Sequence, residues 1–180
     1  MNIFVISADV HECAQALDDL RLNKMILETA QLLSGAAKLL FTLSQDESSS
    51  LYKTTHINHP CAIWARANKH NFIWLVNYFS ALEIEREHRT GKKHLSFTKI
   101  YPSILKLVNS RYTLTEICDF HDCDPVFDFN CTDFKSSPVH MAYKLCLCNK
   151  WSIVDKQAGR TPKWTNRGAP AWYTKEYSNG

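Results

Sequence analysis

Four polar side chains of different chemistry recur at helical spacing near the start of the chain. They are Arg21, Lys24, Glu28 and Gln31, and side chains three or four residues apart on a helix are neighbours, about 5–6 Å between Cβ atoms. A helix here would therefore hold a guanidinium, an ammonium, a carboxylate and an amide in one row. Such a row is typical either of a reactive site or of a solvated helix face.

Lys24 and Glu28 are the candidate catalytic pair within this row. The lysine lies four residues before the glutamate, so a partly buried cleft would hold them as an ion pair or, with the lysine desolvated, would favour a neutral nucleophilic amine. The carboxylate could act as acid, base or stabiliser of a developing cation. The alternative is a surface ion pair, which contributes only about 0.2–0.5 kcal/mol.

A second group of candidates surrounds His59 and Pro60. Proline suits the first turn of a helix, so a helix is predicted to begin here. Its free backbone donors, together with the imidazoles of His56 and His59 and the guanidinium of Arg66, would suit an anion or a phosphate. In the simpler alternative, His59 only caps the helix.

The C-terminal segment 159–180 interleaves cations with aromatic rings. Nucleic acids fit this composition, because bases stack on aromatic faces for about 1–3 kcal/mol each and cations meet phosphates. The alternative is that the two tryptophans pack on the core as anchors. The candidate binding residues of this basic aromatic tail are Lys163, Trp164, Arg167, Trp172 and Tyr173.

The seven cysteines are predicted to be reduced thiols, and no metal or other cofactor is expected. The chain has no pair of Cys-x-x-Cys knuckles, and Cys146 with Cys148 is a poor chelating pair on a helix. A structural zinc is the less favoured alternative. It would take four ligands from Cys118, His121, Cys123, Cys131, His140, Cys146 and Cys148.

Hydrophobic periodicity predicts two long helices that must position these groups. The first covers residues 14–41, and the second runs from Pro60 to Thr90 with Gly91 as its stop. Three polar residues, Asn71, Glu85 and Arg89, fall on the buried face of the second helix. Burying them unpaired would cost roughly 1–3 kcal/mol each, so we expect them to face the polar row of the first helix.

The remaining segments complete a mainly α, single compact domain over residues 1–180. Residues 2–7 read as a short strand or extended segment, and further helices are predicted at 102–112 and 139–151. Residues 44–50 read as a surface loop. Residues 113–137, rich in Asp, Cys and Phe without a clear period, are predicted to be an irregular acidic insertion.

Composition excludes several classes of protein. The 180 residues are 45% hydrophobic and 12% aromatic, which argues against a disordered or fibrous chain. No export signal or membrane-spanning run is recognisable, so a cytoplasmic protein without a membrane partner is expected. The net charge of +3 permits an anionic partner. Bases gather in residues 150–175, the candidate electrostatic surface for that partner.

The first half of the chain resembles a known family. The pattern Leu17-Asp18-x-x-Arg21-Leu22-x-Lys24-x-x-x-Glu28-x-x-Gln31-x-Leu33, followed by His59-Pro60 and Trp64, is similar to the pyrimidine-dimer DNA glycosylase (endonuclease V-like) family and its small phage and bacterial relatives. The tail from Pro162 to Tyr173 is similar to the aromatic, DNA-contacting tail of that family.

The resemblance implies an all-helical fold and base excision through an imine formed by an amine, with a glutamate assisting. The phage enzyme of that family uses the amine of a small second residue exposed when the initiator Met is removed. Asn2 is bulkier, so we expect Met1 to remain and to be one candidate amine, with Lys24 as the other. The family's glutamate directly follows an arginine, whereas Arg21 precedes Leu22, and Glu28 is then the available carboxylate.

The leading hypothesis is thus a protein that excises a damaged or modified pyrimidine from duplex DNA, with AP-lyase activity as a further step. The rival is a pocket that binds a nucleotide or phosphorylated ligand, or modifies a base without excision. A third reading is a buried ion-pair network or protein interface. The candidate substrate contacts outside the tail are Arg21, Gln31, His59, Arg66, Asn71 and Arg89.

Overall fold

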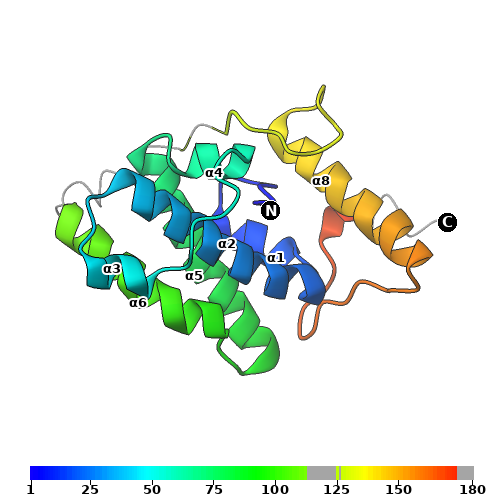
Figure 1. Cartoon of the computed structure of the whole chain (residues 1–180). Coiled ribbons are helices and arrows are strands. Elements are labelled where there is room, and N and C mark those ends of the chain that lie inside the picture. Colours follow the sequence, from blue (N-terminus) through cyan, green and yellow to red (C-terminus); the bar gives the residue numbers. More distant parts are fainter. Residues whose placement is uncertain (113–124, 126, 174–180) are drawn as a thin grey trace.

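The computed structural model describes residues 1–112, 125 and 127–173. Within them the regular structure is helical and no β-strand occurs, which confirms the mainly α fold class (Figure 1). The elements are α1 (Val10–Ala16), α2 (Asp19–Leu40), α3 (Gln45–Ser50), α4 (Pro60–Ala65), α5 (Lys69–Thr90), α6 (Leu95–Arg111), α8 (Val139–Asn149) and the π-helical η1 (Lys150–Asp155).

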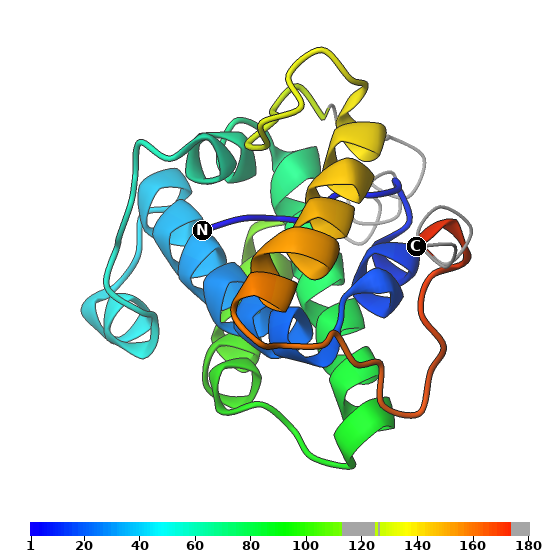
Figure 2. The ribbon, with the colours of Figure 1, turned by 90° about the vertical axis from the view of Figure 1, so that its right-hand side faces the viewer.

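The two long helices α2 and α5 pack against each other at the centre of the molecule. α1 lies against α5, and α6 lies against α2 (Figure 1). On the other side, α8 lies across the N-terminal segment of residues 1–9, and η1, which continues α8, lies against the start of α2 (Figure 2). That segment is extended, and its side chains from Ile3 to Ile6 are buried in the hydrophobic core.

The first long helix is interrupted, contrary to the prediction of one helix over residues 14–41. α1 ends at Ala16, and Leu17 and Asp18 adopt extended backbone conformations before α2 begins. This break leaves backbone carbonyls without helical partners. Two side chains satisfy them: Arg89 donates to the carbonyls of Gln15 and Leu17, and Trp164 donates to that of Ala16.

The second long helix is also divided. α4 ends at Ala65, and α5 begins at Lys69 with Asn68 as its N-cap, whose side chain accepts a hydrogen bond from the Asn71 N–H. The predicted stop is confirmed, because Gly91 caps α5 in the left-handed conformation, with φ of 66°.

α6 begins seven residues before the predicted start at Pro102, which lies inside the helix. Its buried residues Ile100, Ile104 and Leu107 continue one apolar stripe across the proline. The burial of this stripe outweighs the one backbone hydrogen bond that proline cannot donate.

Residues 44–50 hold a helix where a loop was predicted. Ser44 and Glu47 form a capping box at the start of α3, each side chain bonding the other's backbone N–H. The prediction at 139–151 is close to the observed α8, which continues into η1. Most of the predicted acidic insertion, residues 113–124 and 126, lies outside the described residues.

Among the described residues, none of the helices combines the length and the apolar character that crossing a bilayer requires.

Candidate active site

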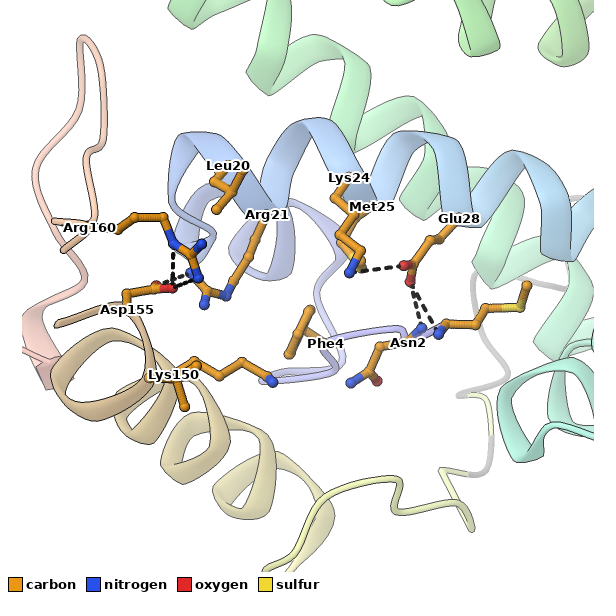
Figure 3. Close-up of a pocket in the computed structure, with 12 residues that line it drawn as sticks. Asn2, Phe4, Leu20, Arg21, Lys24, Met25, Glu28, Lys150, Asp155 and Arg160 are labelled. Atoms are coloured by element: carbon orange, nitrogen blue, oxygen red, sulfur yellow. Dashed lines mark hydrogen bonds and ion pairs between the residues drawn. The ribbon is translucent and has the colours of Figure 1, made fainter. Parts of the chain in front are cut away.

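A cavity of about 330 Å³ lies between α2, the N-terminal segment and η1 (Figure 3). Three members of the predicted row, Arg21, Lys24 and Glu28, line it from α2. Asn2 and Phe4 line it from the N-terminal segment, opposite α2. The row therefore faces a hollow formed with the N-terminal segment and η1, and not with the second long helix as expected.

Glu28 is surrounded by three nitrogen atoms. Its Oε2 accepts a 2.8 Å hydrogen bond from the backbone N–H of Asn2 and lies 3.8 Å from the α-amine of Met1. Its Oε1 lies 3.6 Å from Nζ of Lys24. The Glu28 side chain is only 12% exposed, whereas that of Lys24 is 66% exposed. A sheltered carboxylate thus lies between two candidate amines.

A second group of charges forms the other end of the cavity. Arg21 donates 2.8 and 2.9 Å contacts to Asp155 and Asp18, and Arg160 bonds the other oxygen of Asp155. The indole of Trp151 also donates to Asp18. Burial by itself would raise the pKa of Asp155, but the hydrogen bonds from Arg21 and Arg160 outweigh it and lower the pKa. This network fixes η1 against the start of α2.

Positive charge exceeds negative charge around the cavity. Its lining includes the amine of Met1 and four cationic side chains, against the two carboxylates Glu28 and Asp155. Among the residues drawn in Figure 3, Lys150 contacts neither carboxylate. The cavity therefore favours an anionic ligand. The cationic side chains are Arg21, Lys24, Lys150 and Arg160.

Residues 1–99 match the family model of pyrimidine dimer DNA glycosylases. The chain belongs to the pyrimidine dimer DNA glycosylase family. No curated protein and no solved structure is significantly similar to it. The match covers the segment that carries Met1, Lys24 and Glu28, while η1 and the tail lie beyond it. In this glycosylase-family chain, the side of the cavity that carries Glu28 thus lies within the matched residues 1–99, and the side that carries Lys150 and Arg160 lies outside them.

Sequence reasoning missed five residues of this site. Lys150 and Arg160 were not named as site residues, although they belong to the basic stretch of residues 150–175 that the charge distribution singled out, and Asp155 is the one acid within that stretch. Asp18 lies behind Arg21 on the break before α2. Asn2 contributes a backbone N–H, which no side-chain pattern reveals.

His59 lies close to the N-terminus but does not line the cavity. It caps α4, because its Nδ1 accepts a 3.2 Å hydrogen bond from the Cys61 N–H, as the simpler sequence alternative held. Burial, followed by the positive charge of the Met1 amine, lowers the pKa of His59. Gln31 is half-buried and Arg66 donates to the carbonyl of Ile57. Neither lines the cavity.

Asn71, Glu85 and Arg89 do not face the polar row, so that expectation is wrong. Asn71 donates to the carbonyl of Trp64. Arg89 is fully buried and contacts Glu85 and Asp19 as well as the carbonyls at the end of α1. The helix break after Ala16 leaves those carbonyls without helical hydrogen-bond partners, and the buried guanidinium of Arg89 on α5 donates to them.

The described part of the tail, residues 159–173, packs on the body of this family member, and residues 174–180 lie outside the described residues. Trp164, Trp172 and Tyr173 surround the buried ring of Trp151, with centroids 4.8–5.7 Å from it. Arg167 forms two hydrogen bonds to Glu85. The packing agrees with the alternative in which the tail rings act as anchors. Lys163 is the one predicted tail residue with an exposed side chain.

The cysteines of the described residues form no disulfide with one another. Among the described residues, neither Cys146 nor His140 belongs to a group of three metal-binding side chains, and the His140 ring bonds the carbonyl of Val5. Cys118, His121 and Cys123 lie outside the described residues. Cys131 instead approaches Cys61, with 3.5 Å between the sulfur atoms.

Proposed function

We propose that this chain is a DNA glycosylase that excises a damaged or modified pyrimidine from duplex DNA and also has AP-lyase activity. One observation carries the proposal: the amine of Met1 lies 3.8 Å from the sheltered carboxylate of Glu28, beside a cationic cavity. Membership of the pyrimidine dimer DNA glycosylase family supports the same class of reaction.

In the proposed reaction the neutral amine of Met1 attacks C1′ of the target deoxyribose. The C1′–N bond to the base breaks, its electron pair leaves with the base, and the base takes up a proton. Glu28 accepts the proton lost by the amine and stabilises positive charge that develops on the sugar. The C1′–O4′ bond then breaks and O4′ takes up the proton held by Glu28, which gives an imine. Water hydrolyses the imine to an abasic site, or loss of a C2′ proton expels the 3′ phosphate by β-elimination.

Lys24 is the alternative amine, since its Nζ lies 3.6 Å from the other oxygen of Glu28. Its larger exposure favours a different role, in which Lys24 with Lys150 and Arg160 meets the phosphates of the DNA. The target base must leave the stack for its C1′ to reach the cavity, and damage lowers the cost of that step.

Borohydride trapping tests the proposal. The chain is incubated with duplexes that carry a pyrimidine dimer, modified pyrimidines or an abasic site, and base release is measured in parallel. We expect a covalent adduct that maps to the N-terminal peptide, and Lys24→Ala should still form it. An adduct on Lys24 would reverse the roles of the two amines. Absence of both adduct and base release over the panel would refute the proposed activity.

A second candidate function is the binding of a nucleotide or a phosphorylated small molecule. The cavity volume of about 330 Å³ favours it, because pockets for small ligands begin at about 300 Å³. Thermal unfolding with a panel of nucleotides, but without DNA, separates the two candidates. A rise in the melting temperature with a free nucleotide, combined with no effect of damaged DNA, would favour this second function.

A further inference from the structure

Three metal-binding side chains meet beside the N-terminal segment, outside the cavity. One ring nitrogen of His59 and the sulfur atoms of Cys61 and Cys131 all lie within 4.8 Å of one another. The two sulfurs are 3.5 Å apart although the residues are 70 positions apart in the sequence. Neither the proposed excision chemistry nor the family match accounts for this convergence.

Aromatic packing holds the cluster in place. Cys61 lies in the first turn of α4, and Trp64 of the same helix stacks on Phe127 and contacts Phe129. These contacts bring Cys131, two residues after Phe129, over Cys61. The side chain of Asn130 accepts a hydrogen bond from the Thr132 N–H, which fixes the turn that carries Cys131. The sulfurs are therefore held by the fold.

We propose that His59, Cys61 and Cys131 bind a zinc ion. Two thiolates and one imidazole are ligands that zinc prefers, and a site with three protein ligands leaves the fourth tetrahedral position for water. Two thiolates balance the charge of Zn²⁺, so the site is neutral and tolerates its partly buried position. This assignment replaces the expectation from the sequence that no metal is bound.

The distances suit zinc with small adjustments. With Zn–S bonds of about 2.3 Å, two thiolates on a tetrahedral ion lie roughly 3.8 Å apart, close to the 3.5 Å observed. The half-buried His59 ring would have to move slightly for its nitrogen, which lies within 4.8 Å of both sulfurs, to reach the same ion. Coordination through its Nδ1 would exchange the 3.2 Å capping bond to the Cys61 N–H for a bond to the metal.

A hydrogen bond also fixes the backbone of Cys131. The hydroxyl of Tyr143 accepts a 3.3 Å hydrogen bond from the backbone N–H of Cys131. Groups that hold ligand residues in place are typical of the outer shell of metal sites. Zinc would therefore tie α4 to the residues before α8.

Metal analysis of the full chain, purified with reductant and dialysed after exposure to zinc alone, tests the site. We expect about one zinc ion per chain. Cys61→Ser, Cys131→Ser and His59→Asn should each weaken zinc binding by at least about tenfold. Cys146→Ser is the matched control, since this half-buried thiol on α8 lies outside the cluster, and it should leave zinc binding unchanged.

Cobalt supplies a readout that does not depend on folding alone. Co²⁺ added to the metal-free chain should give the thiolate-to-metal charge-transfer absorption of a tetrahedral site, and Cys131→Ser should lose it while retaining the native circular dichroism. If Co²⁺ added to the metal-free chain gives no such absorption, the proposal is overturned. A disulfide between Cys61 and Cys131 in peptide maps of the native protein, or zinc binding that survives Cys131→Ser, would also overturn it.

Discussion

At the scale of single residues, the position of Glu28 follows from the sequence pattern, and its contacts follow from the tertiary structure. The pattern places it four residues after Lys24, and the fold adds the N-terminal segment, whose Asn2 N–H and Met1 amine approach the same oxygen. The carboxylate is therefore held by a backbone donor while it lies within reach of an amine. This geometry suits proton transfer at a sheltered site.

Glu28→Gln should lower base excision and adduct formation by about 10²-fold or more, the usual contribution of a general acid or base. The amide oxygen can still accept the Asn2 N–H, so the melting temperature should change little. Single-turnover assays on the best substrate measure the loss. The exposed Glu87→Gln on α5 is the control, and equal activity of both variants would remove Glu28 from the mechanism.

Asp155 makes stability depend on pH. Its pKa is lowered in the folded protein by Arg21 and Arg160, so its stabilising contribution is complete above its unfolded pKa of about 3.9. The contribution is lost as the pH falls through the lower folded pKa.

Asp155→Asn should therefore lower the free energy of unfolding by about 2 kcal/mol at neutral pH, because Arg21 and Arg160 lose a charged partner. Between about pH 5 and pH 2 the variant should lose less stability than the parent chain. Urea unfolding at several pH values measures both effects. Parallel stability curves for the two chains would contradict this role of Asp155.

Helix ends decide the arrangement at the scale of elements. The break between α1 and α2 leaves carbonyls without helical partners, and Arg89 and Trp164 donate hydrogen bonds to them. These hydrogen bonds hold α5 and the tail against the break. At the far end of α5, Gly91 allows the chain to turn toward α6 in a conformation that other residues adopt at a cost.

Gly91→Ala should destabilise the protein by about 1–2 kcal/mol, because its φ of 66° places a Cβ in the left-handed region. No neighbour lies within 4 Å of that Cβ, so backbone strain is the cause. Gly168→Ala is the matched control: it has equal space without a left-handed φ. Thermal or urea unfolding compares them, and an equal effect of both would exclude conformational strain.

Charge distribution acts at the scale of the whole molecule. The basic C-terminal stretch folds back so that Lys150 and Arg160 face α2 across the cavity. A net charge of +3 is modest, yet cationic groups outnumber carboxylates around the cavity. This local excess of positive charge favours an anionic partner at that face. DNA binding should therefore depend on salt through a few local contacts.

Lys150→Ala should weaken binding to duplex DNA of any sequence and reduce the slope of log Kobs against log salt by about 1, as loss of one phosphate contact does. Fluorescence anisotropy over a salt series measures the slope. Lys106→Ala is the control, since this exposed lysine lies on α6, away from α8 and η1 (Figure 1). If both variants change the slope equally, the cavity is not the DNA-facing surface.

The sequence by itself determined the mainly α class, the polar row on one helix and the stop at Gly91. These features are local: helical periodicity, spacing of three or four residues and the freedom of glycine act within a few residues. The same local rules missed both helix breaks and placed the start of α6 at Pro102, because burial of an apolar stripe and partners far along the chain outweighed them.

Only the tertiary structure decided what the row faces. Three groups reach their sites from segments distant in the sequence: the Met1 amine and the Lys150 side chain at the cavity beside α2, and the Cys131 thiol beside α4. Their positions depend on core packing around Phe4, Trp64 and Trp151. The long-range contacts that also bury Arg89 and the tail rings arise from the same packing. Chemistry between distant residues is set by such burial, whereas spacing along one helix fixes only neighbours on its own surface.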